Sequence, residues 1–345
     1  MRKKLFNKIV VALITILLII TIGIKAYSVY FFPKISDWNY HQIEKINKNN
    51  QSNKNNFSFI VFGDNKNSIT TFNQLIKKVN QEKALFSIDV GDLTEDGEKE
   101  KFRFFINQIK KAQHPFLTVI GNHGLRENGR ANYYNFFGRF YYSFTIGQNY
   151  FIILDDANET NIDPWQLNWL KNELQKSQKY QHRFIFMHVP LYDPRDANST
   201  IKIAHCLSDK KFAHQLNNLF DQYNVTMVFA SHIHSYFRGY WGKTPYIITG
   251  GAGAELAGTN PKHYFYHYIR VNVSSQGVKY QVIKLKSPPF ELLDQLSHDI
   301  WIYFYSFLTI HFLDLLIIIF LIYFGFYLMF IEDKWIKIIK EKFLR

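Results

Sequence analysis

FSFIVF (57–62), followed at once by Gly63 and Asp64, is the stretch that decides the fold. It is a short, almost wholly apolar run that ends in a glycine and an acid, which is typical of a buried strand entering a turn. The same pattern recurs in ALFSIDV-GD (84–92) and in FLTVI-GN (116–122). Strands that each end in Gly-Asp or Gly-Asn predict a sheet whose polar residues meet at one edge, outside the carboxyl ends of the strands.

Further strands and helices alternate along the middle of the chain. Apolar runs predict strands at 150–155, 183–187, 225–230 and 245–249, and a terminal hairpin within 263–286 that turns at 274–277. Helical spacing predicts amphipathic helices at 68–80, 98–111, 164–175 and 212–223. Asp163 before Pro164 is a typical helix start. This alternation predicts an α/β fold with a mixed central sheet.

Histidines extend the set of polar residues at strand ends. His188 follows the run 183–187, and His232 and His234 follow the run 225–230. In extended backbone, residues two apart project to the same side, so one short segment can serve two metal ions. Carboxylate and amide oxygens combined with imidazole nitrogens suit Mn, Fe or Zn better than Ca or Cu. We therefore expect a metal site built from the ends of five strands.

The order GD, GD, GNH, H and HxH over residues 57–286 resembles the calcineurin-like metallophosphoesterase superfamily, which includes the purple acid phosphatases. The resemblance implies a mixed β-sheet sandwich flanked by helices, with two divalent or trivalent metal ions (Mn, Fe or Zn) and a bridging hydroxide that attacks a phosphate ester. It also implies roles for individual residues: Asp92 bridges the metals, Asp64 and His234 bind the first, Asn122, His188 and His232 bind the second, and His123 stabilises the transition state or protonates the leaving oxygen.

Two positions depart from the family pattern. The family usually has a histidine ligand where this chain has Lys66, although the purple acid phosphatases also lack it. Lys66 either supplies positive charge near the phosphate or points to solvent. Glu95, three residues after Asp92, could replace the lost ligand or be a solvated loop acid. The second departure is Gly124, where the family has an acid that orients the preceding histidine. Arg126, Asn128 and Arg130 follow and could contact phosphate or lie on the surface.

Both ends of the chain carry apolar runs that predict membrane segments, at 5–27 and 300–331. Basic residues lie before the first run and after the second, so the positive-inside rule predicts that both termini are cytoplasmic and that the domain at 57–290 is extracytoplasmic. A cleaved signal peptide is the alternative for the first run, and a buried helix for the second. Residues 28–56 are interpreted as a linker, and 332–345 as a basic cytoplasmic tail.

Charge and cysteine content narrow the function. The formal charge is +13, and more than half of this excess lies in residues 1–30 and 332–345, so we expect no nucleic-acid binding. The single cysteine, Cys206, excludes an intrachain disulfide. The sequence therefore predicts a membrane-anchored hydrolase of phosphomonoesters or phosphodiesters, whose substrate is a phosphate ester. The alternative is a catalytically degenerate binding or scaffold protein at the membrane. Substrate identity, metal identity and oligomeric state stay open.

Overall fold

The computed structural model describes residues 2–27, 30, 34–49, 56–195, 205–286, 291–325 and 327. The chain divides into two compact units. The larger unit comprises Ile35–His298, and the terminal unit combines Met1–Lys34 with Asp299–Arg345. Every strand among the described residues belongs to the larger unit, which contains the region expected to form the α/β domain.

The first sheet of the larger unit has the strand order β11-β10-β1-β2-β3. Its strands are β1 (Phe57–Phe62), β2 (Phe86–Asp89), β3 (Phe116–Thr118), β10 (His267–Ser274) and β11 (Gly277–Lys284). Strands β1 to β3 are parallel, so their carboxyl ends share one edge. The expected terminal hairpin is confirmed, because β10 and β11 pair antiparallel and β10 also pairs antiparallel with β1.

The second sheet has the order β4-β5-β6-β7-β9-β8. It is built from β4 (Tyr142–Ile146), β5 (Asn149–Ile153), β6 (His182–Phe186), β7 (Met227–Ala230), β8 (Tyr236–Trp241) and β9 (Thr244–Thr249). The four inner strands are parallel and correspond to the predicted runs. The antiparallel outer strands β4 and β8 were not predicted, because both are half-exposed edge strands without a continuous apolar run.

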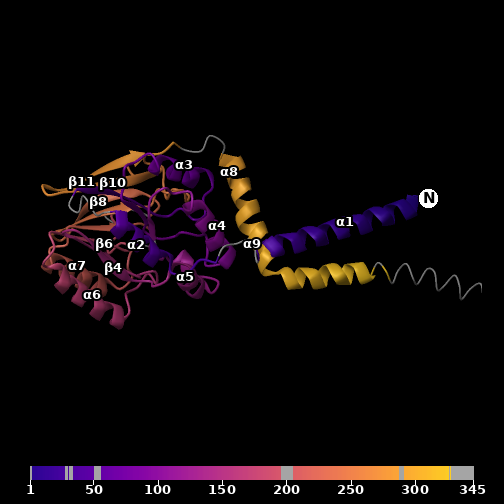
Figure 1. Ribbon diagram of the computed structural model, residues 1–345, viewed down its shortest axis with the longest axis horizontal. Coiled ribbons are helices and arrows are strands. Elements are labelled where there is room, and N and C mark those ends of the chain that lie inside the picture. The colour runs from indigo at the N-terminus through magenta and orange to yellow at the C-terminus, as the bar shows by residue number, and fades with distance from the viewer. Residues whose placement is uncertain are drawn as a thin grey trace, which may run out of the picture. The chain divides into compact units, whose positions relative to one another are not determined.

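Aromatic side chains join the two sheets face to face. The ring of Phe59 on β1 stacks on that of Phe86, with centroids 5.1 Å apart. It also meets Phe151 and Phe184 of the second sheet edge-on, at 5.7 and 5.3 Å. All four side chains are fully buried. The fold is therefore a sandwich of two mixed sheets around a phenylalanine-rich core, which confirms the expected α/β class (Figure 1).

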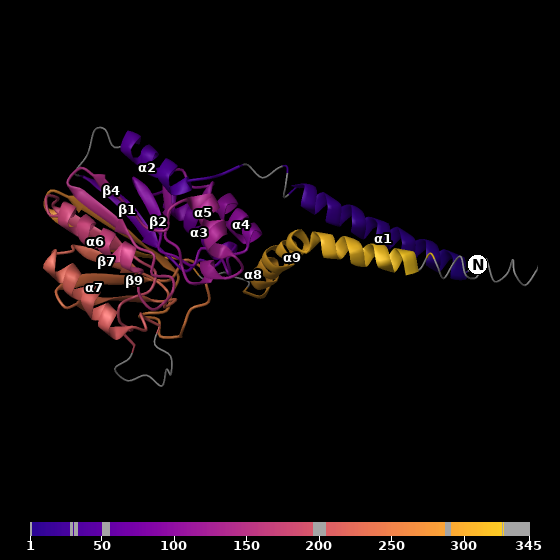
Figure 2. The same cartoon turned by 90° about the horizontal axis from the view of Figure 1, so that it is seen from below.

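Helices cover both outer faces of the sandwich (Figure 2). Helices α3 (Thr70–Val79), α4 (Lys99–Ile109) and α5 (Gly129–Phe137) lie on the side of the first sheet, and α6 (Pro164–Ser177) and α7 (Lys210–Gln222) lie on the side of the second. The predicted start of α6 is confirmed, because the Asp163 carboxylate accepts hydrogen bonds from the backbone N–H groups of Trp165 and Gln166.

Part of the expected linker is a helix of the larger unit. Residues Trp38–Asn49 form α2, which corrects the interpretation of 28–56 as a linker throughout. Asn39, Gln42 and Ile46 are buried, a spacing that places them on one face of the helix. The indole of Trp38 donates to the carbonyl of Phe116, so α2 is fastened to the edge strand β3. The polar composition concealed this narrow buried face.

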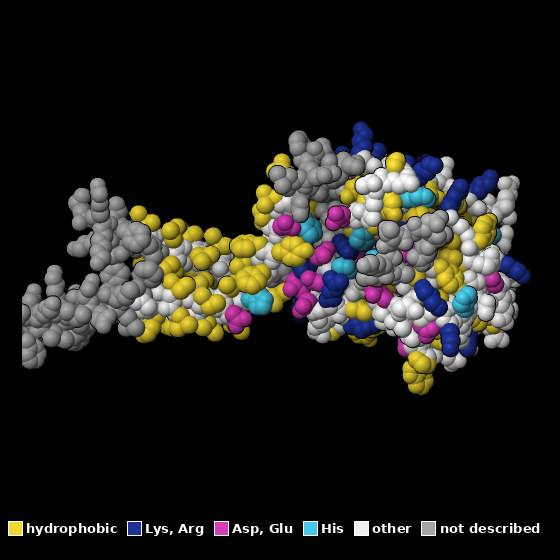
Figure 3. All heavy atoms as spheres, turned by 180° about the vertical axis from the view of Figure 1, so that it is seen from behind, with side chains coloured by type: hydrophobic (Ala, Val, Ile, Leu, Met, Phe, Trp, Pro, Cys, Tyr) yellow, Lys and Arg dark blue, Asp and Glu magenta, His cyan; other side chains and the backbone are white. Residues whose placement is uncertain are grey.

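The terminal unit consists of helices with exposed apolar side chains. It contains α1 (Arg2–Ala26), a π-helical segment (Asp299–Phe304), α9 (Tyr305–Ile310) and a helix at Phe312–Gly325, while α8 (Glu291–His298) ends the larger unit. Figure 3 shows a largely hydrophobic surface on the terminal helices. Leu13 and Leu313 are 61% and 70% exposed. Lys25 donates to the carbonyl of Thr309.

Among the described residues, no single helix combines the length and hydropathy of a bilayer span. The helices Leu296–Ile310 and Phe312–Gly325 meet the criterion only together, with a 75° bend between them, and Val11–Ala26 is a shorter apolar helix. The two predicted membrane segments therefore stay predictions. The predicted tail at 332–345 lies outside the described residues.

Candidate metal centre

The candidate site forms where the carboxyl ends of strands from both sheets meet. Three residues follow strands of the first sheet, and three follow strands of the second: Asp64, Asp92, Asn122, His188, His232 and His234. Asp64, Asp92 and His232 adopt positive φ angles of 60°, 53° and 67°. Non-glycine residues rarely adopt this left-handed conformation, which is found at sites where the surrounding structure holds a side chain in a required direction.

A glycine lets two of these chain segments approach closely. Gly91, with φ of 109°, lies against the imidazole of His188, and a Cβ atom at this position would collide with that ring. The sequence predicted a turn-forming role for this glycine. The structure adds a second reason, since the first sheet can approach His188 of the second sheet only where no side chain intervenes.

Two groups of potential ligand atoms share Asp92. Asp92, His188 and His232 form one group, and Asp64, Asp92 and His234 form the other. Within each group the ligand atoms lie within 4.8 Å of one another. Asp92 alone belongs to both groups, so its carboxylate lies where it can contact two neighbouring ions.

Three potential ligand atoms lie close to His188 Nε2. His188 Nε2 lies 3.0 Å from Asn122 Oδ1, 3.2 Å from His232 Nδ1 and 3.3 Å from Asp92 Oδ1. The other ring nitrogen of His188 lies 3.1 Å from the carbonyl of Val90, to which it donates. This hydrogen bond fixes the tautomer and leaves the Nε2 lone pair free for a metal ion, as in many metal-binding histidines.

The group with Asp64 contains a fully buried carboxylate. Asp64 is fully buried, and neither of its carboxylate oxygens accepts a hydrogen bond within the described residues. Such a carboxylate is costly unless a cation or a proton compensates it. On the same side, His234 Nδ1 lies 2.6 Å from the carbonyl of Glu255, which leaves Nε2 available as the ligand atom.

The electrostatics of the site suit metal binding. Burial, reinforced by the Asp92 charge, raises the pKa of Asp64 well above its usual value. Burial also opposes ionisation of Asp92, but nearby charges, with His188 the largest, outweigh it and lower the pKa of that carboxyl to about 2. Burial lowers the pKa of His234 to about 4 and lowers the pKa of His232 well below its usual value. The imidazoles are thus neutral near pH 7, which is the form that binds metal. The donor set therefore fits two metal ions.

Lys66 lines the cavity of about 460 Å³ that opens at the two groups. Its backbone N–H donates to the carbonyl of Asp92, and its positive charge offsets part of the rise that burial and Asp92 cause in the pKa of Asp64. Glu95 is half-buried, and its carboxylate belongs to neither group of ligand atoms. Its backbone carbonyl instead lies 2.6 Å from His123 Nδ1. The ligand role of Glu95 stays a prediction.

The three polar residues after Gly124 have different positions. Arg126 lines the cavity. Asn128 precedes α5 in a left-handed conformation, and Arg130 forms an ion pair with Asp155 at 2.6 Å. Of the three, therefore, only Arg126 is among the lining residues. The sequence did not single out several other residues of the wall, because loop segments carry no spacing that reveals them: Asn158, Glu159, Thr160, His205 and Ser208.

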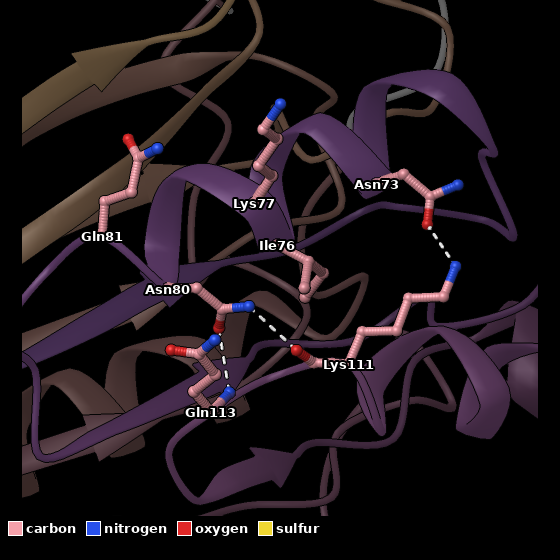
Figure 4. A pocket seen from close by; sticks show the side chains of 7 residues that line it. All are labelled: Asn73, Ile76, Lys77, Asn80, Gln81, Lys111 and Gln113. Carbon is pink, nitrogen blue, oxygen red and sulfur yellow. Dashed lines mark hydrogen bonds between the residues drawn. The ribbon is translucent and has the colours of Figure 1, made fainter.

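A second hollow of about 460 Å³ lies between α3 and the end of α4 (Figure 4). Its polar groups bind one another: the Asn80 amide donates to the Lys111 carbonyl and accepts from the Gln113 N–H, and Lys111 donates to Asn73. None of the residues expected at the metal site lines it. We assign it no functional role.

A two-sheet sandwich in which two ligand groups share one aspartate at the strand ends defines a candidate dinuclear metalloprotein. The profile of the calcineurin-like phosphoesterase family matches residues 57–236, which is more than half of the chain. The chain therefore belongs to the calcineurin-like phosphoesterase family. The family predicted from the order of the motifs is confirmed.

Individual relatives are distant. A probable cyclic nucleotide phosphodiesterase of Xenorhabdus bovienii is 27% identical over 66 residues, which is 18% of this chain. The match spans 27% of the length of that relative. Among solved structures, a dimetal phosphatase from Danio rerio is 13% identical, with a TM-score of 0.52 over 67% of this chain and 99% of that chain. GAP50 of Plasmodium is 16% identical, with a TM-score of 0.50 over 72% and 95%. At these identities the likeness shows a common fold.

Proposed function

We propose that the chain is a membrane-anchored, metal-dependent hydrolase of phosphomonoesters or phosphodiesters. The observation that carries this proposal is the sharing of Asp92 by two ligand groups within the matched region of the chain. Bound there, two ions of Mn, Fe or Zn would activate a water molecule and offset the charge of the phosphoryl oxygens. The residues of the chain supply the binding and the orientation.

Three side chains of the cavity wall suit the handling of a phosphate ester. Lys66 and Arg126 are cationic and can bind phosphoryl oxygens that lie beyond the metal ligands. His123 also lines the cavity. Its Nδ1 is engaged by the carbonyl of Glu95, so Nε2, 3.9 Å from Asp92 Oδ2, is the atom that can give a proton to the leaving oxygen.

The membrane location is part of the proposal. The exposed apolar side chains of the terminal helices favour it, and the basic residues beside both apolar runs favour cytoplasmic termini. The enzyme domain then lies on the extracytoplasmic side of the cell membrane. Cysteine labelling tests this topology. In a Cys206→Ser background, a cysteine placed at Trp165, which is 82% exposed, should react with an impermeant thiol reagent added outside intact cells. Reaction only after lysis would place the domain inside.

The activity is tested on the full-length chain in detergent, with aryl phosphate monoesters and diesters and added Mn. Hydrolysis is expected, and Asp92→Asn should abolish it. Asp209→Asn is the matched control, because Asp209 caps α7 and is not among the residues of the cavity wall. An Asp92→Asn variant as active as the Asp209→Asn variant would overturn the proposal.

A scaffold protein that retains the fold is the second candidate function. The position of Lys66 favours it, because an ammonium group beside Asp64 and Asp92 can compete with the first metal ion. GAP50, one of the proteins of similar fold, is described as the anchor in the inner membrane complex of Plasmodium. Elemental analysis separates the two candidates. Two metal ions per chain together with ester hydrolysis count for the enzyme, and a metal-free, inactive protein counts for the scaffold.

A further inference from the structure

His123 is oriented by a backbone carbonyl. Its ring atom Nδ1 lies 2.6 Å from the backbone oxygen of Glu95, and its backbone N–H donates to Asp92 Oδ1 at 3.0 Å. The family pattern has an acid after this histidine, and the present chain has Gly124. A Cβ atom at Gly124 would lie 3.5 Å from Ile120 and 3.8 Å from Phe102, so a side chain there would enter an apolar environment. In this fold the carbonyl of residue 95 therefore performs the task of the missing acid.

We propose that Asn67 is the positioning residue that holds this carbonyl in place for His123. The proposal rests on the proposed hydrolase function, in which His123, protonated at both ring nitrogens, gives its Nε2 proton to the leaving oxygen as the P–O bond breaks and its electron pair stays on that oxygen. The ring is left neutral, with the Nδ1–H that donates to the Glu95 carbonyl. Asn67 is fully buried, and its Oδ1 accepts a hydrogen bond from the Glu95 N–H at 3.1 Å. This contact fixes the Glu95 residue whose carbonyl faces the imidazole.

The Asn67 amide is itself held at both ends. Its Nδ2 donates to the carbonyl of Lys101 in the first turn of α4, at 3.0 Å. Its backbone N–H lies 3.1 Å from Asn65 Oδ1 and 3.3 Å from the carbonyl of Leu93. The φ angle of Asn67 is 58°, a conformation that asparagine tolerates better than most residues. The loop after β1, the loop after β2 and α4 thus meet at one side chain.

This geometry predicts an effect on proton donation and little effect on metal binding. The hydrogen bonds of the Asn67 side chain go to the backbones of Lys101 and Glu95, neither of which is one of the six candidate ligands. A general acid contributes roughly 10²- to 10⁴-fold to a reaction that needs it. It matters for alkyl leaving groups, which must be protonated, and little for dinitrophenolate, which leaves as a stable anion.

The test compares Asn67→Ala with the wild-type full-length chain on an alkyl phosphate and on 2,4-dinitrophenyl phosphate. We expect kcat to fall about 10- to 100-fold on the alkyl ester, as partial loss of an acid requires, and to change little on the dinitrophenyl ester. The metal content should be unchanged. Asn67→Asp retains an acceptor for the Glu95 N–H and should recover part of the loss. Gln108→Ala is the matched control, because Gln108 is a buried amide that donates to the carbonyl of Ser68.

A purely structural role would reduce kcat equally on both esters, and that result overturns the proposal, as does an unchanged rate on the alkyl ester. A wild-type chain that hydrolyses neither ester would refute the hydrolase function instead. In that case ¹⁵N NMR of the histidine rings still decides the positioning role. In the neutral ring, the Nδ1–H tautomer of His123, assigned with His123→Gln, should be present in the wild type and lost in Asn67→Ala. Persistence of the tautomer in the variant would refute the role.

Discussion

His188 Nε2 and His232 Nδ1 face each other at 3.2 Å, and Asn122 Oδ1 lies within 3.2 Å of both. When His232 carries its ring proton on Nε2, these two imidazole nitrogens and the amide oxygen all present lone pairs at this point, so the arrangement is repulsive unless a cation lies between them. The other ring nitrogen of His188, Nδ1, already donates to the carbonyl of Val90. A metal ion resolves this conflict, which is why the centre is interpreted as a metal site.

The shared position of Asp92 predicts the number of metal ions lost in each of two variants. Asp64→Asn should lose one of the two ions, whereas Asp92→Asn should lose both, because Asp92 belongs to both groups. In each variant the affinity for the lost ions should fall by more than the roughly 10–100-fold decrease that follows removal of a residue that only hydrogen-bonds to a ligand. Metal titration by calorimetry measures both. Equal stoichiometry in the two variants would contradict a bridging position.

Replacing Lys66 with histidine should strengthen binding at the group that contains Asp64. The substitution removes a positive charge beside Asp64 and Asp92 and adds an imidazole ligand. The φ angle of Lys66 is 43°, and histidine is among the residues that tolerate this region. We expect affinity to rise at least about tenfold, or roughly 1.4 kcal/mol. Lys66→Ala removes the charge alone, so a rise of the same size in that variant would show that the added ligand contributes nothing.

The two interpretations of Glu95 are separated by Glu95→Ala. The backbone carbonyl that faces His123 survives this substitution, and the carboxylate lies outside both ligand groups. We expect unchanged metal stoichiometry and an activity within about twofold, since loop substitutions of this kind change free energies by roughly 0.5 kcal/mol or less. Loss of one metal ion would instead establish the carboxylate as a ligand.

Helix α2 should contribute measurably to the stability of the larger unit. Asn39 accepts a hydrogen bond from the Thr118 N–H at 3.0 Å and approaches the Thr118 hydroxyl at 3.1 Å, and both residues are buried. Asn39→Ala leaves the Thr118 N–H without its acceptor and should cost about 1–3 kcal/mol of the free energy of unfolding. Urea unfolding measures it. Tyr40→Ala, on the exposed face of the same helix, should cost much less.

His267 should make the protein less stable in mild acid. Burial lowers the pKa of this imidazole to about 4 in the folded chain, from an ordinary value near 6.5. Between these pH values the unfolded chain binds a proton that the folded chain does not. The contribution of neutral, buried His267 to the free energy of unfolding is therefore fully present above pH 6.5. It falls as the pH drops toward 4, by an amount on the order of 3 kcal/mol at most.

Unfolding of His267→Gln at pH 7 and pH 5 measures this effect, because the variant should show a smaller difference between the two conditions than the wild type. His41→Gln removes an exposed imidazole and serves as the control. A pH dependence identical in wild type and His267→Gln would exclude His267 as its source.

The sequence was most informative where a single rule connected local pattern to position in space. Strand ends predicted that Asp64, Asp92 and His188 meet at one edge, and the structure brings them into the two ligand groups. The N-cap of α6 and the terminal hairpin followed from local turn and capping chemistry in the same way.

Backbone contacts and narrow buried faces were not predictable. The Glu95 carbonyl that orients His123 is common to every residue type, so no side-chain pattern could reveal it. In sequence Asn67 resembles a loop residue, but in the structure it is fully buried. Its role was not predictable because its hydrogen-bond partners come from segments about thirty residues away. Helix α2 was concealed by polar residues on its exposed face.

The six candidate ligands divide evenly between the two halves of the sandwich. Asp64, Asp92 and Asn122 follow strands of one sheet, and His188, His232 and His234 follow strands of the other. Ions bound there would connect the two sheets at the carboxyl ends of their strands. The affinity for metal would therefore depend on how accurately the two sheets are aligned. The ring of Phe59 contacts residues of both sheets. A smaller side chain at this position would thus disturb the alignment of the sheets before it prevents folding of the chain. In the described sheet order, no strand pair joins the two sheets by hydrogen bonds. The metal content of a purified variant therefore reports how well the two sheets are aligned with each other.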